Sequence, residues 1–168
     1  FAFESQQKAE AAQKAGHFTR EIVPVTLTER GKSIAVDTDE HPRHGSTLEA
    51  LAKLPLVFPK VEGHDGIITA GSSSGITDGG AALVIASDKW AADRGLEPLA
   101  RITGWASAGV DPRLMGIGPV PAIKKLYDRH GLDIASFDLV ELNEAFAAQV
   151  LAVLKDVPVE REKLNVNG

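Results

Sequence analysis

The stretch DLVELNEAFAAQVLAVL, residues 138–154, decides the fold of this chain, because it predicts a buried strand that leads directly into a helix. The strand is indicated by a short apolar run, made of Phe137, Leu139, Val140 and Leu142. Apolar side chains then recur at helical spacing on one face of residues 145–154, at Phe146, Val150, Val153 and Leu154. Open α/β sheets bind ligands outside the carboxyl ends of their strands, so this junction is a candidate site.

Asn143 stands at the junction and has two interpretations. It is the N-cap of the helix or a polar group directed into a site, and the two roles are compatible. From these residues alone the cap is favoured, because Asn ranks among the leading N-cap residues. The neighbouring Glu144 is a candidate general acid or base. A place in the first helical turn gives it a sufficient structural role with the helix dipole, and that role is favoured.

The composition limits the function classes. With 43% hydrophobic and 24% charged residues the chain is typical of globular proteins, and its net charge of −5 argues against a nucleic-acid or anionic membrane surface. No apolar run approaches the ~20 residues that span a bilayer, and residues 1–16 lack the features of a signal peptide. The absence of cysteine excludes disulfides and thiolate metal sites. Because the chain begins without Met and ends at Asn-Gly, we expect a piece of a longer protein.

The remaining pattern predicts α/β layers. Good helix formers fill residues 4–15 before Gly16, and a capping box of Ser46 and Glu49 predicts a helix over 47–53. Further helices are expected over 88–94 and 119–130, and strands over 21–28, 31–40, 67–70, 81–86 and 99–106. Strands alternate with helices only after residue 80, so residues 1–76 are expected to form a separate excursion.

The loop GSSSGITDGG, residues 71–80, is the second informative stretch. Glycines allow a backbone to approach a ligand closely, and free N–H groups and hydroxyls hold phosphate or amide oxygens. No Lys-Ser/Thr pair follows the glycines and the G-x-G-x-x-G spacing is absent, so neither a P-loop nor a dinucleotide fingerprint is present. Between two predicted strands, the loop is expected to be a shaped turn near a site.

The histidines have structural explanations. His41 and His44 lie among acidic residues, but Pro42 argues against a shared helical face, and a third metal ligand with suitable spacing is missing. A solvated turn is therefore the default, and no metal site is predicted. Arg43 in that turn is a natural phosphate anchor, while His130 at a helix end favours the dipole. No Ser-His-Asp arrangement is indicated.

Four motifs together resemble the thiolase family of acetyl-CoA acetyltransferases and 3-ketoacyl-CoA thiolases. They are NEAFAAQ at 143–149, SSGITDGGAAL at 73–83, GVDPRLMGIGP at 109–119 and NVNG at 165–168. The resemblance also covers DEHPRHGSTLEALAKL at 39–54 and runs through essentially the whole chain. Several motifs in the family's order make it specific.

The resemblance implies an α/β fold, with mixed sheets layered between helices in two similar halves and a loop domain inserted in the first. This chain would hold an incomplete set of those parts. Residues 1–76 would be a portion of the loop domain, 77–96 the end of the N-terminal half, and 97–168 the beginning of the C-terminal half.

The resemblance also implies the chemistry: Claisen condensation or thiolysis through an acyl-cysteine. One cysteine is the nucleophile, a second is the acid/base, and a Gly-His-Pro histidine activates the first. Asn143 matches the Asn that holds a water stabilising the oxyanion, a role in which a fixed donor contributes ~3 kcal/mol. The balance thus shifts, and Asn143 becomes a catalytic residue that also caps its helix.

By the same resemblance, six residues would contact coenzyme A or its acyl group. Ser74 would meet the pantetheine arm and Arg43 the nucleotide end. The arm and the acyl pocket would be lined by Phe58, Ala70, Met115 and Phe146. Coenzyme A and acyl-CoA enter as substrates, and no prosthetic group is implied.

Because both cysteines and the Gly-His-Pro histidine are absent here, this chain alone is expected to be inactive. The expected protein is a cytoplasmic thiolase, a homo-oligomer (dimer or tetramer) of fatty acid metabolism, with no nucleic-acid or membrane partner. Two alternatives stay open: a non-catalytic, thiolase-like acyl-CoA-binding protein, and an inactive folding or assembly fragment. An isolated fragment would expose an apolar sheet face.

Overall fold

A computed structural model describes residues 1–168, with the side chain of Val61 left out. The chain begins with α1 (Ala2–Lys14) and continues into two antiparallel hairpins, β1 (Val25–Glu29) with β2 (Lys32–Val36) and β3 (Lys60–Val61) with β4 (His64–Asp65). Helix α2 (Leu48–Ala52) lies between the hairpins in the sequence. The remaining elements are short or helical: η1 (Ala70–Ser72), α3 (Asp88–Ala92), η2 (Pro112–Ile117), α4 (Pro119–His130), η3 (Ile134–Ser136) and α5 (Ala147–Asp156).

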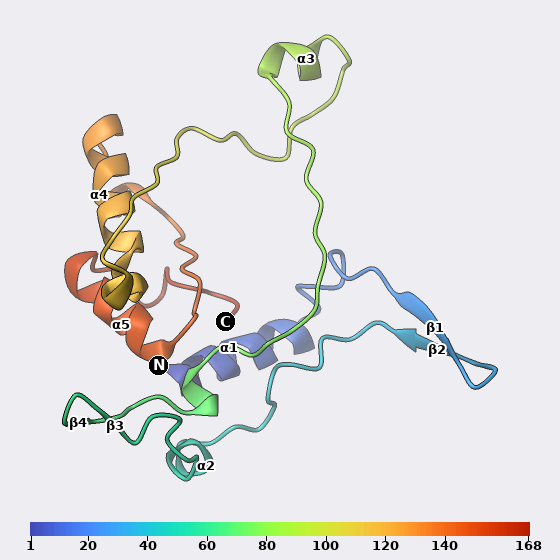
Figure 1. Cartoon of the computed structure of the whole chain (residues 1–168). Coiled ribbons are helices and arrows are strands. Elements are labelled where there is room, and N and C mark those ends of the chain that lie inside the picture. Colours follow the sequence, from blue (N-terminus) through green and yellow to red (C-terminus); the bar gives the residue numbers. More distant parts are fainter.

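The elements form an open arrangement around α1. Figure 1 shows α4 and α5 on one side of α1, the β1–β2 hairpin projecting on the other side, and α3 carried far from both by two long extended segments. Both chain ends lie close to α1. Within the described part of the chain, no helix has the length and apolar character needed to cross a bilayer.

Several helices begin and end where the sequence predicts. The first helix is followed by Gly16, whose φ of +74° is the left-handed conformation that suits glycine. Helix α4 begins at Pro119, whose fixed φ suits a first turn, and ends at Gly131 with φ +61°. The cap of α2 differs from the prediction. Thr47 accepts a hydrogen bond from the amide of Ala50 in place of Ser46, so the predicted capping box is wrong.

The predicted strands over 81–86 and 99–106 do not form. These residues are extended but unpaired in the described structure, and Leu83, Val84 and Leu99 are about as exposed as in an open chain. A strand needs a neighbour that accepts its backbone hydrogen bonds, and local sequence supplies only the tendency to extend. The predicted strand over 67–70 is likewise reduced to one antiparallel bridge between Leu56 and Thr69.

The strand predicted before α5 is only partly present, and its predicted burial is wrong, since none of residues 137–142 is buried and Leu139 is 61% exposed. Its one recorded pairing is a parallel bridge between Val140 and Leu164. The helical face that follows is confirmed at Val150 and Val153, which are fully buried, whereas Phe146 precedes the helix and is exposed. The core of α4 and α5 consists of Val120, Val153 and Val157, with partly buried neighbours Ile117, Ile123, Ile134 and Leu142. This core holds the segment that reaches the candidate site.

Candidate functional site

The junction between residues 138–142 and α5 differs from the prediction in one respect. Helix α5 begins at Ala147, and its N-cap position is Phe146, which makes no side-chain cap hydrogen bond. Asn143 lies outside the helix, so its predicted capping role is wrong. Its side chain is exposed and makes no hydrogen bond within the described part of the chain. The amide of Asn143 is therefore available to a ligand.

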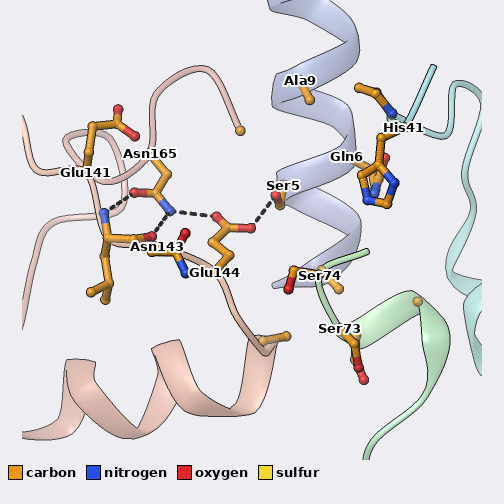
Figure 2. Close-up of a pocket in the computed structure, with 17 residues that line it drawn as sticks. Ser5, Gln6, Ala9, His41, Ser73, Ser74, Glu141, Asn143, Glu144 and Asn165 are labelled. Atoms are coloured by element: carbon orange, nitrogen blue, oxygen red, sulfur yellow. Dashed lines mark hydrogen bonds between the residues drawn. The ribbon is translucent and has the colours of Figure 1, made fainter. Parts of the chain in front are cut away.

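Asn143 lies on a pocket of about 610 Å³ that several segments share. Ser5 and Gln6 of α1 form one side, Ser72, Ser73 and Ser74 a second, and residues 141–144 a third. Figure 2 shows His41 on the far side of α1 from Asn143, next to Gln6. The pocket thus joins the two stretches that the sequence singles out, the Gly/Ser loop and the Asn143 junction.

Backbone hydrogen bonds bring the Gly/Ser loop to this junction. The amide of Ser74 donates to the carbonyl oxygen of Ala145 over 3.0 Å, and Ser73 pairs with Phe146 in an antiparallel bridge. The Ser73 hydroxyl is turned away and donates to the carbonyl oxygen of Thr69 over 2.8 Å. Ser74 stays exposed at the pocket.

Glu144 occupies a different setting from the one predicted. It precedes α5, so it does not sit in the first helical turn. Its Oε2 accepts a hydrogen bond from the Ser5 hydroxyl over 2.5 Å, and its Oε1 accepts one from Asn165 Nδ2 over 2.6 Å. Figure 2 shows the carboxylate between these two side chains. Both oxygens are occupied, which suits an anchoring role better than proton transfer.

Asn165 is a pocket residue that opens the NVNG motif but for which the sequence predicted no role. It is only 4% exposed, and its backbone has a left-handed φ of +44°. The local signal was available, because Asn is among the residues that most readily adopt this conformation. Its partners lie more than 20 residues away in sequence, so the pattern of neighbouring residues does not reveal them.

Helix α1 holds the last residues of the chain in place beside the pocket. Lys8 Nζ donates to the carbonyl oxygen of Leu164 over 2.8 Å, and Arg161 forms an ion pair with Glu4. Arg161 lowers the pKa of the Glu4 carboxyl below its usual range, first by a hydrogen bond and then by charge. Gly168 approaches α1 so closely that an added Cβ would overlap Ser5 and Ala9.

The other predicted contacts lie outside this pocket. Arg43, Phe58, Ala70 and Met115 are exposed and do not line it. Phe146 is 36% exposed at the start of α5, next to the pocket rather than on it. Of the predicted site residues, Ser74 and Asn143 line this pocket, and Phe146 lies beside it, paired with Ser73.

The histidines lie in different surroundings. His41 lines the pocket and packs against Gly75, where an added Cβ would overlap its ring. His44 bonds to Gln13 of α1 over 2.5 Å. His130 ends α4, as predicted. In the part of the chain that the structure describes, no group of three or more His, Asp or Glu side chains is arranged to hold a metal ion.

Sequence comparison identifies matches over nearly the whole chain. Residues 1–89 match the family described as the N-terminal domain of thiolase, and residues 96–168 match its C-terminal domain. The chain is 51% identical over 168 residues to an acetyl-CoA acetyltransferase of Rhizobium meliloti (strain 1021), covering 100% of the chain and 42% of that protein. It thus spans less than half the length of this relative.

Structural comparison agrees. The acetyl-CoA acetyltransferase of Bacillus anthracis superposes with a TM-score of 0.93 at 49% identity, over 99% of this chain and 41% of that one. A human mitochondrial 3-ketoacyl-CoA thiolase in complex with CoA superposes with a TM-score of 0.88 at 46% identity, over 99% of this chain and 40% of that one. These matches confirm the thiolase-like α/β fold, of which this chain forms a part.

Proposed function

The chain belongs to the thiolase family, and on that premise we propose that it acts within an acetyl-CoA C-acyltransferase. The reaction is thiolysis of a 3-ketoacyl-CoA by coenzyme A, or the reverse condensation, through an acyl-cysteine. This chain has no cysteine and no Gly-His-Pro sequence, so the nucleophile, the second cysteine and the activating histidine come from further segments of the protein. The chain supplies Asn143 and part of the coenzyme A surface.

The convergence of Asn143 and Ser74 on one pocket carries this proposal. Asn143 presents an exposed amide at the end of a strand-like segment held by the α4–α5 core. A donor fixed there is suited to hold a water against the oxyanion of a thioester, where charge develops during acyl transfer. Ser74 presents a hydroxyl nearby, which suits the amide groups of a pantetheine arm.

The remaining coenzyme A contacts belong to the same proposal. Arg43 offers a guanidinium to the nucleotide end, and the arm and acyl group are lined by Phe58, Ala70, Met115 and Phe146. Their exposed positions leave them accessible to a ligand.

The division of the chain into parts belongs to the proposal as well. Residues 1–76 act as a loop-domain portion, 77–96 as the end of the first half and 97–168 as the start of the second. The gap between the two family matches, residues 90–95, supports a division in this region.

The test is a thiolysis assay on the longer protein that carries this chain. We expect acetoacetyl-CoA to be consumed in the presence of coenzyme A, with an acylated cysteine detectable by mass spectrometry. Residues 1–168 alone, as the matched control, are expected to show no turnover. Coenzyme A binding without turnover in the longer protein would favour the alternative, a non-catalytic acyl-CoA-binding protein. If the longer protein neither binds coenzyme A nor shows turnover, both the proposed function and this alternative are contradicted.

Assembly and location complete the proposal. The longer protein is a dimer or tetramer, it resides in the cytoplasm, and it serves fatty acid metabolism. Light scattering measures the assembly, and a mass equal to one chain would contradict it.

A further inference from the structure

The side chain of Asn165 takes the place of a paired strand where the backbone pairing between residues 140 and 163–165 stops. Upstream, the amide of Val140 donates to the carbonyl oxygen of Lys163, and the amide of Asn165 donates to the carbonyl oxygen of Val140, both over 2.9 Å. This is the pattern of a parallel ladder. Asn165 then turns into the left-handed conformation at φ +44°, and its backbone leaves the ladder.

The side-chain amide of Asn165 continues this ladder to Leu142, the next residue whose backbone groups need a partner. Its Oδ1 accepts from the backbone amide of Leu142 over 2.7 Å, and its Nδ2 donates to the carbonyl oxygen of Leu142 over 2.8 Å. A carboxamide carries the same donor and acceptor as a peptide group, so one side chain satisfies both backbone groups of Leu142. The same Nδ2 also reaches Glu144 Oε1 over 2.6 Å.

These bonds hold the two neighbours of Asn143, one through its backbone and the other through its side chain. Leu142 is fixed by Asn165, and the carboxylate of Glu144 is fixed by Asn165 and by Ser5. Asn143 itself makes no side-chain hydrogen bond in the described structure, so its direction depends on the backbone that carries it. A donor misplaced by about 1 Å loses much of its catalytic effect, on the order of 100-fold.

We propose that Asn165 is a positioning residue for Asn143, acting through the backbone of Leu142 and the carboxylate of Glu144. This inference rests on the proposed catalytic role of Asn143. It assigns Asn165 no contact with substrate.

The first test compares Asn165→Gly and Asn165→Ala in the longer protein. Both variants remove the side-chain hydrogen bonds to Leu142 and Glu144. Glycine accepts the left-handed backbone of this position, whereas alanine is strained there. We expect both to lower kcat for thiolysis by about 10- to 100-fold with KM for coenzyme A nearly unchanged, while Asn165→Ala has the lower Tm. Asn167→Ala is the matched control, because Asn167 bonds to His17 instead of the junction; its kcat should stay at the wild-type value. A kcat loss that follows Tm across the three variants would overturn the proposal.

The second test uses Asn165→Asp, which keeps the size and the acceptor but loses the donor at neutral pH. The new carboxylate would face the carboxylate of Glu144. The nearby cation is Lys8, which is bonded to the carbonyl oxygen of the adjacent Leu164. Two neighbouring carboxylates raise the pKa of one of them, and the protonated form restores a donor. We expect the kcat of Asn165→Asp relative to wild type to rise as pH falls. A ratio that is flat with pH, or wild-type kcat throughout, would overturn the proposal.

A double variant separates this inference from the proposed function. In an Asn143→Ala background, Asn165→Gly should lower kcat by less than about twofold further, since residues that act as a unit are not additive. An undiminished further loss would overturn the positioning role. Wild-type turnover in Asn143→Ala alone would instead contradict the catalytic role of Asn143, on which the inference rests.

Discussion

Replacing Asn143 with alanine in the longer protein should separate catalysis from folding. The side chain is exposed, makes no hydrogen bond in the described structure and does not cap α5, whose N-cap position is Phe146. Surface changes of this kind alter the free energy of unfolding by less than about 0.5 kcal/mol. Loss of a donor aimed at developing charge costs about 3 kcal/mol of transition-state stabilisation, which is on the order of 100-fold in turnover.

The assay is steady-state thiolysis with kcat and KM for coenzyme A determined separately, together with a thermal melt. We expect kcat to fall on the order of 100-fold, while KM and Tm stay near the wild-type values. Asn143→Asp is the companion variant, because it keeps the side-chain size and removes the donor; its loss should be at least as large. Unchanged turnover in either variant would refute the catalytic role, and a Tm lowered by many degrees would refute the structural reasoning.

Three further predictions concern single residues, and each is tested in the longer protein. Ser74→Ala should raise KM for coenzyme A about fivefold, the equivalent of one hydrogen bond, with kcat unchanged; an unchanged KM would remove Ser74 from the binding surface. Gly131→Ala should lower the free energy of unfolding by about 1 kcal/mol, because φ at this position is +61°. A denaturant titration that gives equal stability would contradict the left-handed conformation of Gly131 at the end of α4. Because Arg161 lowers the pKa of Glu4, their pair stabilises the fold above the ordinary Glu pKa of 4.5 and is lost as pH falls through the lower folded-state pKa. Glu4→Gln should therefore lower Tm at pH 7 but not in strong acid. A loss of Tm that is independent of pH would contradict a stabilising ion pair between Glu4 and Arg161.

Local sequence predicts the helices well where their end signals are local. Gly16 and Gly131 end α1 and α4 because the left-handed turn after a helix suits glycine, whatever surrounds it. The buried face of α5 follows in the same way from the spacing of Val150 and Val153. These features depend on residues a few positions apart.

The strands and the cap could not be predicted in this way. Leu83 and Leu99 lie in segments whose composition favours strands, yet both are exposed and unpaired in the described structure, since pairing depends on a neighbour distant in the sequence. Asn143 and Thr47 show the same for caps: Asn143 has the right residue type and lies outside the helix, while Thr47 takes the cap predicted for Ser46. Residue type alone does not decide which position is the first to leave the helical conformation.

The sequence by itself determined the family, with the α/β class that the family implies, and the two stretches that carry Ser74 and Asn143, because short motifs and helical spacing are local properties of the chain. Only the tertiary structure decided that these stretches share one pocket, that Glu144 bridges Ser5 and Asn165, and that Asn165 completes the ladder at Leu142. The physical reason is that the hydrogen bonds of Glu144 and Asn165 satisfy buried or half-buried polar groups with partners distant in sequence. Such partners become neighbours only when the chain folds.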